Sequence, residues 1–381
     1  MRNKVLFLTL RVFATGGIEK VCRVAGKALY ELGLQKGELI KIFSMYGAPH
    51  RADGNKYFPQ LIFRGFTHKR IRFVLDSIRE GRKSKIVLLS HINLLLVGYL
   101  IKRTRPSVKL VLLAHGIEVW RVLPSWKKKM LLRCDLILPV SHFTKDRMIE
   151  MHGLPEEKFV MLNNCLDPFS ELPLEKKRSV LLMNHYGFTN ENIVLLTVSR
   201  MVDTERYKGY DKVLLVLPEL IKEYPQLRYL LVGRYDDAEK KRLDELINYL
   251  GLQDIVVFTG LLPDEVLGAH FKMGDIFIMP SEKEGFGIVF IEAMFYGLPV
   301  IAGNKDGSVD ALWNGELGTL IDPDNKAAIV SSIKAILGDS AKYKPDQQKL
   351  QEHFSYSSYK RKLGNCLEGL DVKNEMKAKR K

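Results

Sequence analysis

Short runs of apolar residues recur along the whole chain, separated by longer segments in which apolar residues repeat with a helical period. The predicted strands are KVLFLTL, KIVLLS, VKLVLLAH, LILPVS and FVMLNN in the first half, and IVLLTVSR, YLLVG, IVVFTG, IFIMPS and PVIAG in the second. Uninterrupted apolar strands that alternate with helices are typical of parallel sheets covered on both faces. The pattern therefore predicts an α/β protein built from two doubly wound domains.

A polar stretch with turn residues and mixed charge, residues 167–192, separates the two sets of strands. We therefore predict a first domain at 1–170, a linker at 171–190, a second domain at 191–350 and a final helix at 351–370. Ligands bind at the carboxyl ends of the strands in open parallel sheets. Two such domains are expected to face each other and to share a ligand in the cleft between them.

The length of 381 residues also favours two domains. The longest apolar run, residues 86–101, contains Ser90, His91 and Asn93, and is predicted to be a strand, a loop and a helix start rather than a membrane span. The apolar run at residues 5–10 is too short for a signal peptide. The four cysteines have no metal-ligand spacing.

The positive charge is concentrated in the first half of the chain. Residues 1–170 hold 30 Lys and Arg against 13 Asp and Glu, a net charge of +17, whereas the remaining residues have a net charge of −2. Such asymmetry points to an anionic partner for the first half: a membrane surface, a phosphorylated lipid or a nucleic acid. Ordinary solvated surface lysines are the alternative.

The stretch EGFGIVFIEA, residues 284–293, places Glu292 in an apolar helix that looks buried. A buried carboxylate needs hydrogen-bond donors, from side chains or from a ligand. Gly285 and Gly287 allow close backbone approach, and the amides of residues 286–288 open a helix N-terminus that suits an anion. If the segment from Glu284 to Glu292 were helical throughout, it would span roughly 12 Å, about the length of a diphosphate between two sugars.

Other residues that bear on this site follow neighbouring predicted strands. They are Arg200 and Lys208 after IVLLTVSR, Thr259 and Gly260 at the end of IVVFTG, and GNKDGS at 303–308. Two cations beside a helix N-terminus would form a diphosphate clamp. A nucleotide-sugar fits this arrangement, with Glu292 accepting from ribose hydroxyls and Glu284 from the donated sugar.

These motifs together resemble family 4 of the retaining glycosyltransferases. The likeness rests on the Glu284–Glu292 spacing in its EGFG context, Arg200, Lys208–Gly209 and FTG. It extends over nearly the whole chain, from GGIEK near the start through NNCLD before the linker to FSYSSY before the last helix. The resemblance implies the GT-B fold of two facing Rossmann-like domains, a final helix that crosses back to the first domain, and no metal or cofactor. The gap between Arg200 and Lys208 is longer than in the family pattern.

The resemblance also implies a role for each matching residue. Arg200 and Lys208 would hold the donor diphosphate, Glu292 the ribose, and Glu284 the sugar. The donor-binding residues are expected to be Gly16, Gly17, Arg200, Lys208, Thr259, Gly260, Glu284, Gly285, Phe286, Gly287, Ile288 and Glu292. Catalytic roles are expected for His115, Arg200, Lys208 and Glu284, with His115 facing the transferred sugar.

Alternatives remain open for several of these residues. Glu284 could be an ordinary loop acid, Glu292 could pair with a core lysine, and His115 could be structural. His91, Asn164 and Asp167 are expected to fix loops or the hinge. Asp322 and Asp324 look like a metal-binding pair, but a proline turn explains them better.

Three other function classes could account for parts of the pattern. A nicotinamide enzyme is disfavoured because the chain has no G-x-G-x-x-G. A nucleic-acid-binding protein is disfavoured because aromatic residues do not interleave with the basic ones. A GT-B sugar phosphorylase stays open, and would require free phosphate.

Two basic stretches with apolar residues suit a membrane surface. Residues 120–133 have the composition of an interfacial helix and include Trp126, Lys127, Lys128 and Lys129; residues 68–85 form the second stretch. Either stretch could instead cover its own sheet. We favour the membrane reading: a cytoplasmic enzyme, peripheral on the inner face of the membrane, that binds no nucleic acid.

The segments ERYKGYD and GNKDGSVDAL resemble the branch of the family that assembles bacterial exopolysaccharides. That branch includes mannosyltransferases that act on polyprenyl-diphosphate oligosaccharides. The resemblance makes GDP-mannose the favoured donor, UDP-sugars the next, and a lipid-linked glycan precursor the expected acceptor.

Overall fold

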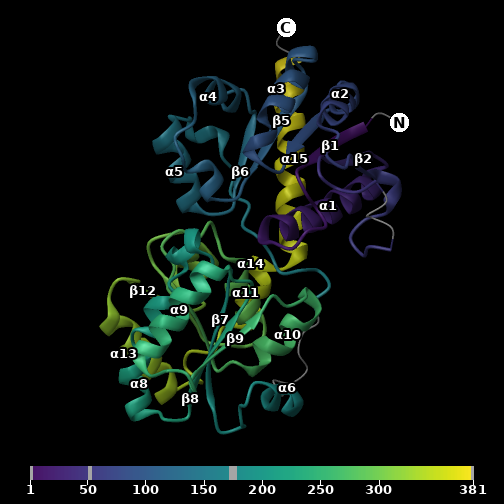
Figure 1. The fold of residues 1–381 in the computed structure, drawn as a ribbon. Helices are drawn as coiled ribbons and strands as arrows, with labels where there is room; N and C mark the ends of the chain where they lie inside the picture. Colours follow the sequence, from purple (N-terminus) through teal and green to yellow (C-terminus); the bar gives the residue numbers. More distant parts are fainter. Residues whose placement is uncertain (1–2, 50–53, 171–177, 379–381) are drawn as a thin grey trace. The chain divides into compact units, whose positions relative to one another are not determined.

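The computed structural model describes residues 3–49, 54–170 and 178–378. The chain forms two compact units (Figure 1). Unit 1 comprises Met1–Phe169 and Phe354–Lys381, and unit 2 comprises Ser170–His353. Residues 171–177 of the predicted linker lie outside the described residues, and Val180–His185 of that linker form a short helix, α6.

Unit 1 is built on a six-stranded parallel sheet. Its strands are β1 (Asn3–Thr9), β2 (Leu39–Ser44), β3 (Phe63–Gly65), β4 (Ile86–Leu89), β5 (Lys109–Ala114) and β6 (Leu136–Pro139). The strand order is β3-β2-β1-β4-β5-β6, and every neighbouring pair is parallel. The order reverses between β1 and β4, which is the position where doubly wound sheets bind ligands.

Helices cover both faces of this sheet. They are α1 (Gly17–Lys36), α2 (Arg70–Gly81), α3 (Leu95–Thr104), α4 (Ser125–Leu131), α5 (His142–His152) and α15 (Tyr356–Ala378). Alternate residues of β1 face opposite sides: Phe7 packs in a core with α1 and α15, and Leu8 in a core with α2 to α5. This alternation follows from the two-residue period of a strand, and explains why the strands read as continuously apolar.

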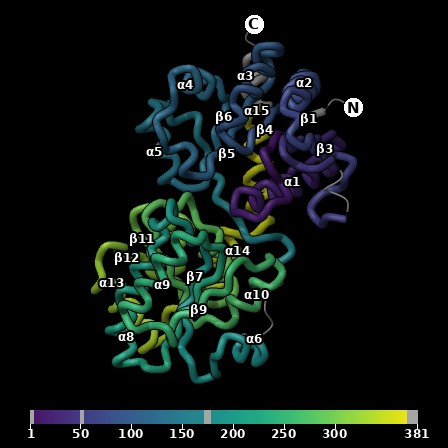
Figure 2. The backbone as a smooth tube through the Cα atoms, viewed as in Figure 1, coloured from purple at the N-terminus to yellow at the C-terminus, as the bar shows by residue number. Residues whose placement is uncertain are grey.

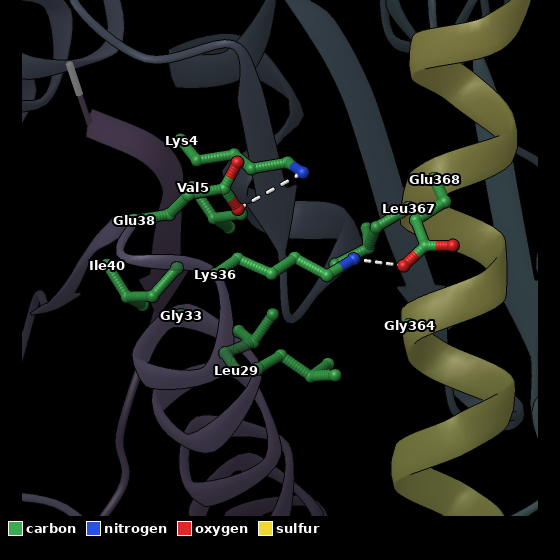
Figure 3. A pocket seen from close by; sticks show the side chains of 11 residues that line it. Lys4, Val5, Leu29, Gly33, Lys36, Glu38, Ile40, Gly364, Leu367 and Glu368 are labelled. Carbon is green, nitrogen blue, oxygen red and sulfur yellow. Dashed lines mark hydrogen bonds and ion pairs between the residues drawn. The ribbon is translucent and has the colours of Figure 1, made fainter.

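The last helix belongs to unit 1, where it lies along α1 (Figure 3). A small pocket between the two helices is lined by apolar residues such as Leu29 and Leu367, and Gly364 of α15 leaves room for Leu32 of α1. Lys36 forms an ion pair with Glu368 across the pocket. The chain leaves unit 1 after Phe169 and returns to it at Phe354 (Figure 2). These two crossings lie close together, since the amide of Leu166 donates to the carbonyl of Phe354 at 2.9 Å.

Unit 2 repeats the same topology. Its strands are β7 (Ile193–Val198), β8 (Leu227–Val232), β9 (Val256–Gly260), β10 (Ile276–Met279), β11 (Val300–Gly303) and β12 (Thr319–Ile321). The parallel order is β12-β11-β10-β7-β8-β9, so this sheet reverses between β7 and β10. The main helices are α7 (Tyr210–Leu214), α8 (Leu217–Glu223), α9 (Asp237–Leu250), α10 (Asp264–Met273), α11 (Ile288–Phe295), α12 (Ser308–Ala311), α13 (Lys326–Gly338) and α14 (Gln347–Phe354).

The two faces of this sheet are covered by different helices. Residues of α7, α8, α9 and α13 form one core with Leu195 and Ile278. On the other face Phe277 packs against Phe290 of α11 and Phe271 of α10, with ring centroids 5.8 and 6.1 Å apart. The prediction of two Rossmann-like domains is confirmed by the two sheets.

Nine of the ten predicted strands contain an observed strand, and FVMLNN is wrong. Phe159 makes only an isolated bridge to Ile137, because this segment runs past the edge strand β6 without continuous pairing. The pattern missed β2, β3 and β12, which are short or carry charged residues. Residues 86–101 form β4, a short 3₁₀ helix (Ile92–Leu94) and the start of α3, as predicted.

The basic stretch at 120–133 is less helical than its composition suggests. Only Ser125–Leu131 form a helix, because Pro124 stands in extended backbone immediately before it. Leu123 and Leu131 are buried in the core of unit 1, whereas the Trp126 side chain is 55% exposed. The stretch therefore both covers its own sheet and presents an apolar residue to solvent. No helix in the described part of the chain is long and apolar enough to span a membrane.

Candidate functional site

Several of the predicted donor-site residues of unit 2 lie where its strand order reverses. Arg200 comes two residues after β7, and Glu284 lies in the loop that links β10 to α11. These two strands are neighbours, with Ile276 paired to Leu195. Their carboxyl ends meet at the edge of the sheet where ligands bind in doubly wound folds.

Lys208 and Glu284 are in direct contact. The Lys208 amine forms an ion pair with the Glu284 carboxylate, and both side chains are largely shielded from solvent. The loops that carry them are joined by a backbone hydrogen bond, in which the amide of Glu282 donates to the carbonyl of Tyr207 at 2.9 Å. The structure therefore brings together two predicted catalytic residues that are far apart in the sequence.

Arg200 stands nearby in the chain with a more exposed side chain. Its guanidinium Nη2 lies 2.6 Å from Oε1 of Glu205, which belongs to the 3₁₀ helix Asp203–Lys208 that ends at Lys208. Arg200 and Lys208 thus each hold a carboxylate partner. An incoming anion would compete with these carboxylates for the two cations.

The N-terminus of α11 opens towards the same loop. Gly287 precedes the helix with φ +80°, a left-handed conformation that favours glycine, and no side chain caps the helix. The first amides of such a helix are available to an anion. The helix starts only at Ile288, so the assumption of a helical segment from Glu284 to Glu292 is wrong. Glu292 itself is buried, as predicted.

Asp306 holds the loop between β10 and α11, which carries Glu284, in place. Asp306 was not named among the site residues predicted from the sequence. One of its carboxylate oxygens accepts from the Ser281 hydroxyl at 2.7 Å and from the Glu284 amide at 2.6 Å. The other accepts from the Ser308 amide at 2.8 Å. Burial raises the pKa of Asp306 to about 6, against the opposing effect of these hydrogen bonds. The sequence feature that could have indicated this role is the single acidic residue of GNKDGS, which follows a predicted buried strand.

Thr259 and Gly260 end β9, which is the edge strand of the sheet two positions from β7. The Thr259 hydroxyl donates to the carbonyl of Gly260 at 2.9 Å. Their predicted place in the donor site stays a prediction. Asp322 and Asp324 bind lysines: Lys305 lies 2.6 Å from Asp322 and 2.7 Å from Asp324. These pairs satisfy both carboxylates, in agreement with a structural turn.

In unit 1, His115 follows β5 and is held at the carboxyl edge of the sheet. Its Nε2 donates to the carbonyl of Ser90 after β4 at 2.8 Å, and its amide donates to Glu118 Oε1 at 2.6 Å. Its Nδ1 is buried and has no hydrogen-bond partner within the described residues. The ring of His115 is thus held in place through its other nitrogen, Nε2. Its catalytic role stays a prediction.

Other predicted residues of unit 1 lie at the start of α1 or in loops. Gly16 caps the N-terminus of α1 and Gly17 is its first residue. His91 accepts from the Asn93 amide at 3.0 Å, and Asp167 accepts from the Phe169 amide at 2.9 Å. His91 and Asp167 therefore fix loops, as expected of them.

Comparison with known proteins gives family and fold. The model of Glycosyltransferase Family 4 matches residues 15–168, and the model of Glycosyl transferases group 1 matches residues 182–361. Among solved structures, Anabaena HepE in complex with UDP has a TM-score of 0.77 at 19% identity, with 96% of this chain and 100% of that chain covered. A sucrose-phosphate synthase from Thermosynechococcus elongatus has a TM-score of 0.75 at 19% identity, with 97% and 100% covered.

Among curated proteins, a GDP-mannose-dependent alpha-(1-6)-phosphatidylinositol monomannoside mannosyltransferase of Mycolicibacterium smegmatis is 31% identical over 65% of each chain. The mannosylfructose-phosphate synthase of Agrobacterium fabrum is 29% identical over 51% of this chain and 43% of its own length. The chain thus spans about two thirds or less of these curated relatives. Since the two family models match both halves of the chain and both sheets have the Rossmann order, the protein belongs to glycosyltransferase family 4 and has the GT-B fold.

Proposed function

We propose that this protein transfers a sugar from a nucleotide-sugar to a glycan acceptor, with retention of configuration and without a metal or cofactor. The observation that supports this most is the contact between Lys208 and Glu284 beside the N-terminus of α11. The site offers cations and helix amides to a diphosphate, and a carboxylate to sugar hydroxyls. Membership of the family supports a glycosyltransferase activity.

The ion pair suggests how the donor would be received. The Lys208 amine would exchange the Glu284 carboxylate for a diphosphate oxygen, which leaves Glu284 to accept from the sugar. Arg200 would similarly exchange Glu205 for the diphosphate. These groups would then stabilise negative charge as the sugar–phosphate bond breaks, an electrostatic form of catalysis that is strongest with preorganised groups. In this proposal Glu292 holds the ribose, and His115 keeps the catalytic role predicted for it.

The favoured donor is GDP-mannose, followed by UDP-sugars. The name of the Mycolicibacterium relative specifies GDP-mannose, whereas the structures of Anabaena HepE contain UDP and UDP-glucose. Because the names of these proteins specify different nucleotide bases, the base of the donor is best tested by measuring the binding of nucleotides to this protein.

Among the nucleotides GDP, UDP and dTDP, we expect GDP to raise the melting temperature of the protein most. Among the corresponding nucleotide-sugars, we expect GDP-mannose to raise it most. A ligand at 100 times its Kd stabilises a protein by about 2.7 kcal/mol. A thermal-shift series measures this directly, with Lys208→Ala as the variant that should lose the effect. Stabilisation by UDP alone would disprove the mannose donor. No shift with any nucleotide would disprove nucleotide-sugar binding.

The acceptor is proposed to be lipid-linked, with unit 1 peripheral on the inner face of the membrane. Helices α2, α3 and α4 cover the same face of the sheet in unit 1, and their outer surfaces carry exposed apolar side chains. Ile71 and Leu75 of α2 are 79% and 61% exposed, and Trp126 of α4 is 55% exposed. Exposed apolar residues among lysines and arginines are typical of membrane-surface helices.

Reversing the charge of Lys128 and Lys129 is expected to release the protein from acidic vesicles. Each Lys or Arg near such a surface contributes about 1 kcal/mol, so reversing two charges should lower the bound fraction severalfold or more. Sedimentation with vesicles of acidic phospholipid measures it. The matched control is Lys241→Glu with Lys326→Glu, the same charge change at exposed positions of unit 2. If the wild-type protein stays in the supernatant at low salt, where screening is weakest, the membrane proposal is wrong.

A further inference from the structure

One buried carboxylate of unit 2 holds the segment that carries Lys208. This segment, residues 203–210, comprises a 3₁₀ helix and the start of α7. Glu239, in the first turn of α9, is 0% exposed. Its Oε2 accepts from the Arg206 Nε at 3.1 Å, and its Oε1 accepts from the Tyr210 hydroxyl at 2.7 Å. Arg206 stands two residues before Lys208 and Tyr210 two residues after it, so the same carboxylate binds the chain on both sides of the lysine.

The first turn of α9 also fixes the start of this segment. Asp236 caps α9, and its Oδ1 accepts from the Glu239 amide at 2.8 Å. Its Oδ2 accepts from the Asp203 amide at 3.2 Å, and its own amide donates to the carbonyl of Met201 at 3.2 Å. The position of α9 is therefore transmitted to the segment at three places: before it, at its start and around Lys208.

The backbone of the segment gives Lys208 little support of its own. Glu205 interrupts the 3₁₀ helix with φ −123° and ψ 24°. Hydrogen-bond geometry in a 3₁₀ helix is also poorer than in an α-helix, and such helices are used in short pieces. Contacts with α9 therefore help to set the direction in which the Lys208 side chain leaves the chain to reach Glu284.

The Glu239 carboxylate is held on every side by hydrogen-bond donors. Arg242, one turn further along α9, donates from Nε to Oε2 at 2.9 Å and from Nη2 to Oε1 at 2.5 Å. Burial acts to raise the pKa of Glu239, but the hydrogen bonds from Arg242 and Tyr210 outweigh it and lower the pKa below its ordinary value. A buried ion pair is weak evidence for a gain in stability, because lost hydration offsets much of the attraction. What this network does supply is a fixed point for two side chains that flank Lys208.

We propose that Glu239 is a positioning residue for Lys208, which acts by holding Arg206 and Tyr210 so that the lysine amine is presented to the donor diphosphate. The inference rests on the proposed function, in which Lys208 exchanges Glu284 for a diphosphate oxygen. With Arg206 and Tyr210 bound to α9, the lysine changes partner while its backbone stays in place. Glu239 is fully buried, and acts on the donor only through this segment.

Two variants remove the proposed support. Arg206→Met breaks the link to Glu239 at a side chain that is 48% exposed, together with a pair that Arg206 makes with Asp203. Glu239→Gln keeps the size of the side chain and removes only its charge. In both variants kcat is expected to fall about ten- to hundredfold, because a displacement of about 1 Å at a reacting group can cost about 10² in rate.

Nucleotide affinity shows whether this loss concerns the diphosphate. Calorimetry gives the preference for a nucleoside diphosphate over its monophosphate, with GDP against GMP and UDP against UMP as probes. In Arg206→Met this preference is expected to fall about tenfold, because a charge-assisted contact to the second phosphate is weakened. The matched control is Lys240→Met, which removes a cation that pairs with Asp244 of its own helix at 2.5 and 2.6 Å. Such an i,i+4 pair contributes little, so kcat and the preference should stay within about twofold of the wild type.

A double-mutant cycle with Lys208→Ala distinguishes positioning from a general loss of stability. If Arg206 acts through Lys208, then Arg206→Met in the Lys208→Ala background should lower kcat by less than about twofold, since coupled residues are not additive. An equal fall in kcat in both backgrounds overturns the inference, as does an unchanged diphosphate preference in Arg206→Met when the wild type prefers diphosphates. Failure of the wild type to bind any of the four nucleotides overturns the donor proposal instead.

Discussion

Replacement of Lys208 by alanine is expected to lower kcat by about two orders of magnitude or more, with the fold intact. The reason is that Lys208 would neutralise the leaving diphosphate, and loss of one such preorganised group typically costs about 10²–10³ in rate. The lysine lies at the end of a 3₁₀ helix on the rim of the sheet and is not part of the apolar core. Initial-rate kinetics with a nucleotide-sugar and circular dichroism check both parts.

The matched control for Lys208 is Lys212→Ala. Lys212 also pairs with an acid of the same loop, Glu282 at 3.0 Å, and with Asp324 at 2.7 Å. It lies one turn further along the chain in α7, so its removal should leave turnover within severalfold of the wild type. Near-normal turnover of Lys208→Ala would rule out its assignment to the diphosphate. Complete loss of wild-type activity on addition of a chelator would contradict the metal-free mechanism.

Gly307→Ala is expected to destabilise the protein and to reduce activity about a hundredfold. A Cβ at this position would lie 2.1 Å from the carbonyl oxygen of Gly285 and 2.8 Å from that of Glu284. Both are backbone atoms, so the loop that carries Glu284 has to move. Overpacking typically costs about 1–3 kcal/mol, and a displacement of about 1 Å in a reacting group can cost about 10² in rate. Urea denaturation and kcat/KM measure the two effects.

The control for Gly307 is Gly338→Ala at the end of α13. A Cβ there meets no atom within 4 Å, and the residue is helical and exposed. Alanine is favoured over glycine inside helices by about 1 kcal/mol, so this variant should be unchanged or slightly more stable and fully active. If Gly307→Ala unfolds like the wild type and keeps its kcat/KM, then the close packing of residues 284 and 307 has no part in activity.

The position of the loop between β10 and α11, which carries Glu284, depends on two features that act together. Asp306 accepts hydrogen bonds from Ser281 and from the Glu284 amide, and Gly307 donates from its amide to the Glu284 carbonyl at 2.8 Å. Both peptide groups of Glu284 are thereby held by the loop after β11. In the proposed mechanism the Glu284 carboxylate exchanges Lys208 for a sugar, and this support would keep its backbone in place while its side chain moves.

The sequence by itself determined the fold class and most strands, because strands buried on both faces have to be apolar at every position. KVLFLTL and IFIMPS could therefore be located without knowing their neighbours. It also determined the family, through Arg200, Lys208 and the Glu284–Glu292 spacing. The run FVMLNN was misjudged because an apolar segment beside an edge strand looks the same as a paired one.

Only the tertiary structure decided which of these residues meet. Lys208 and Glu284 come together because β7 and β10 are neighbours, and strand order depends on how whole helices pack, which no local pattern contains. Asp306 became a support for the loop for the same reason. The start of α11 at Ile288 was decided by the left-handed backbone of Gly287, in a run that is apolar on either side. Lys127 was separated from Lys128 and Lys129 by its contact with Asn93, since charge alone made the three lysines equivalent.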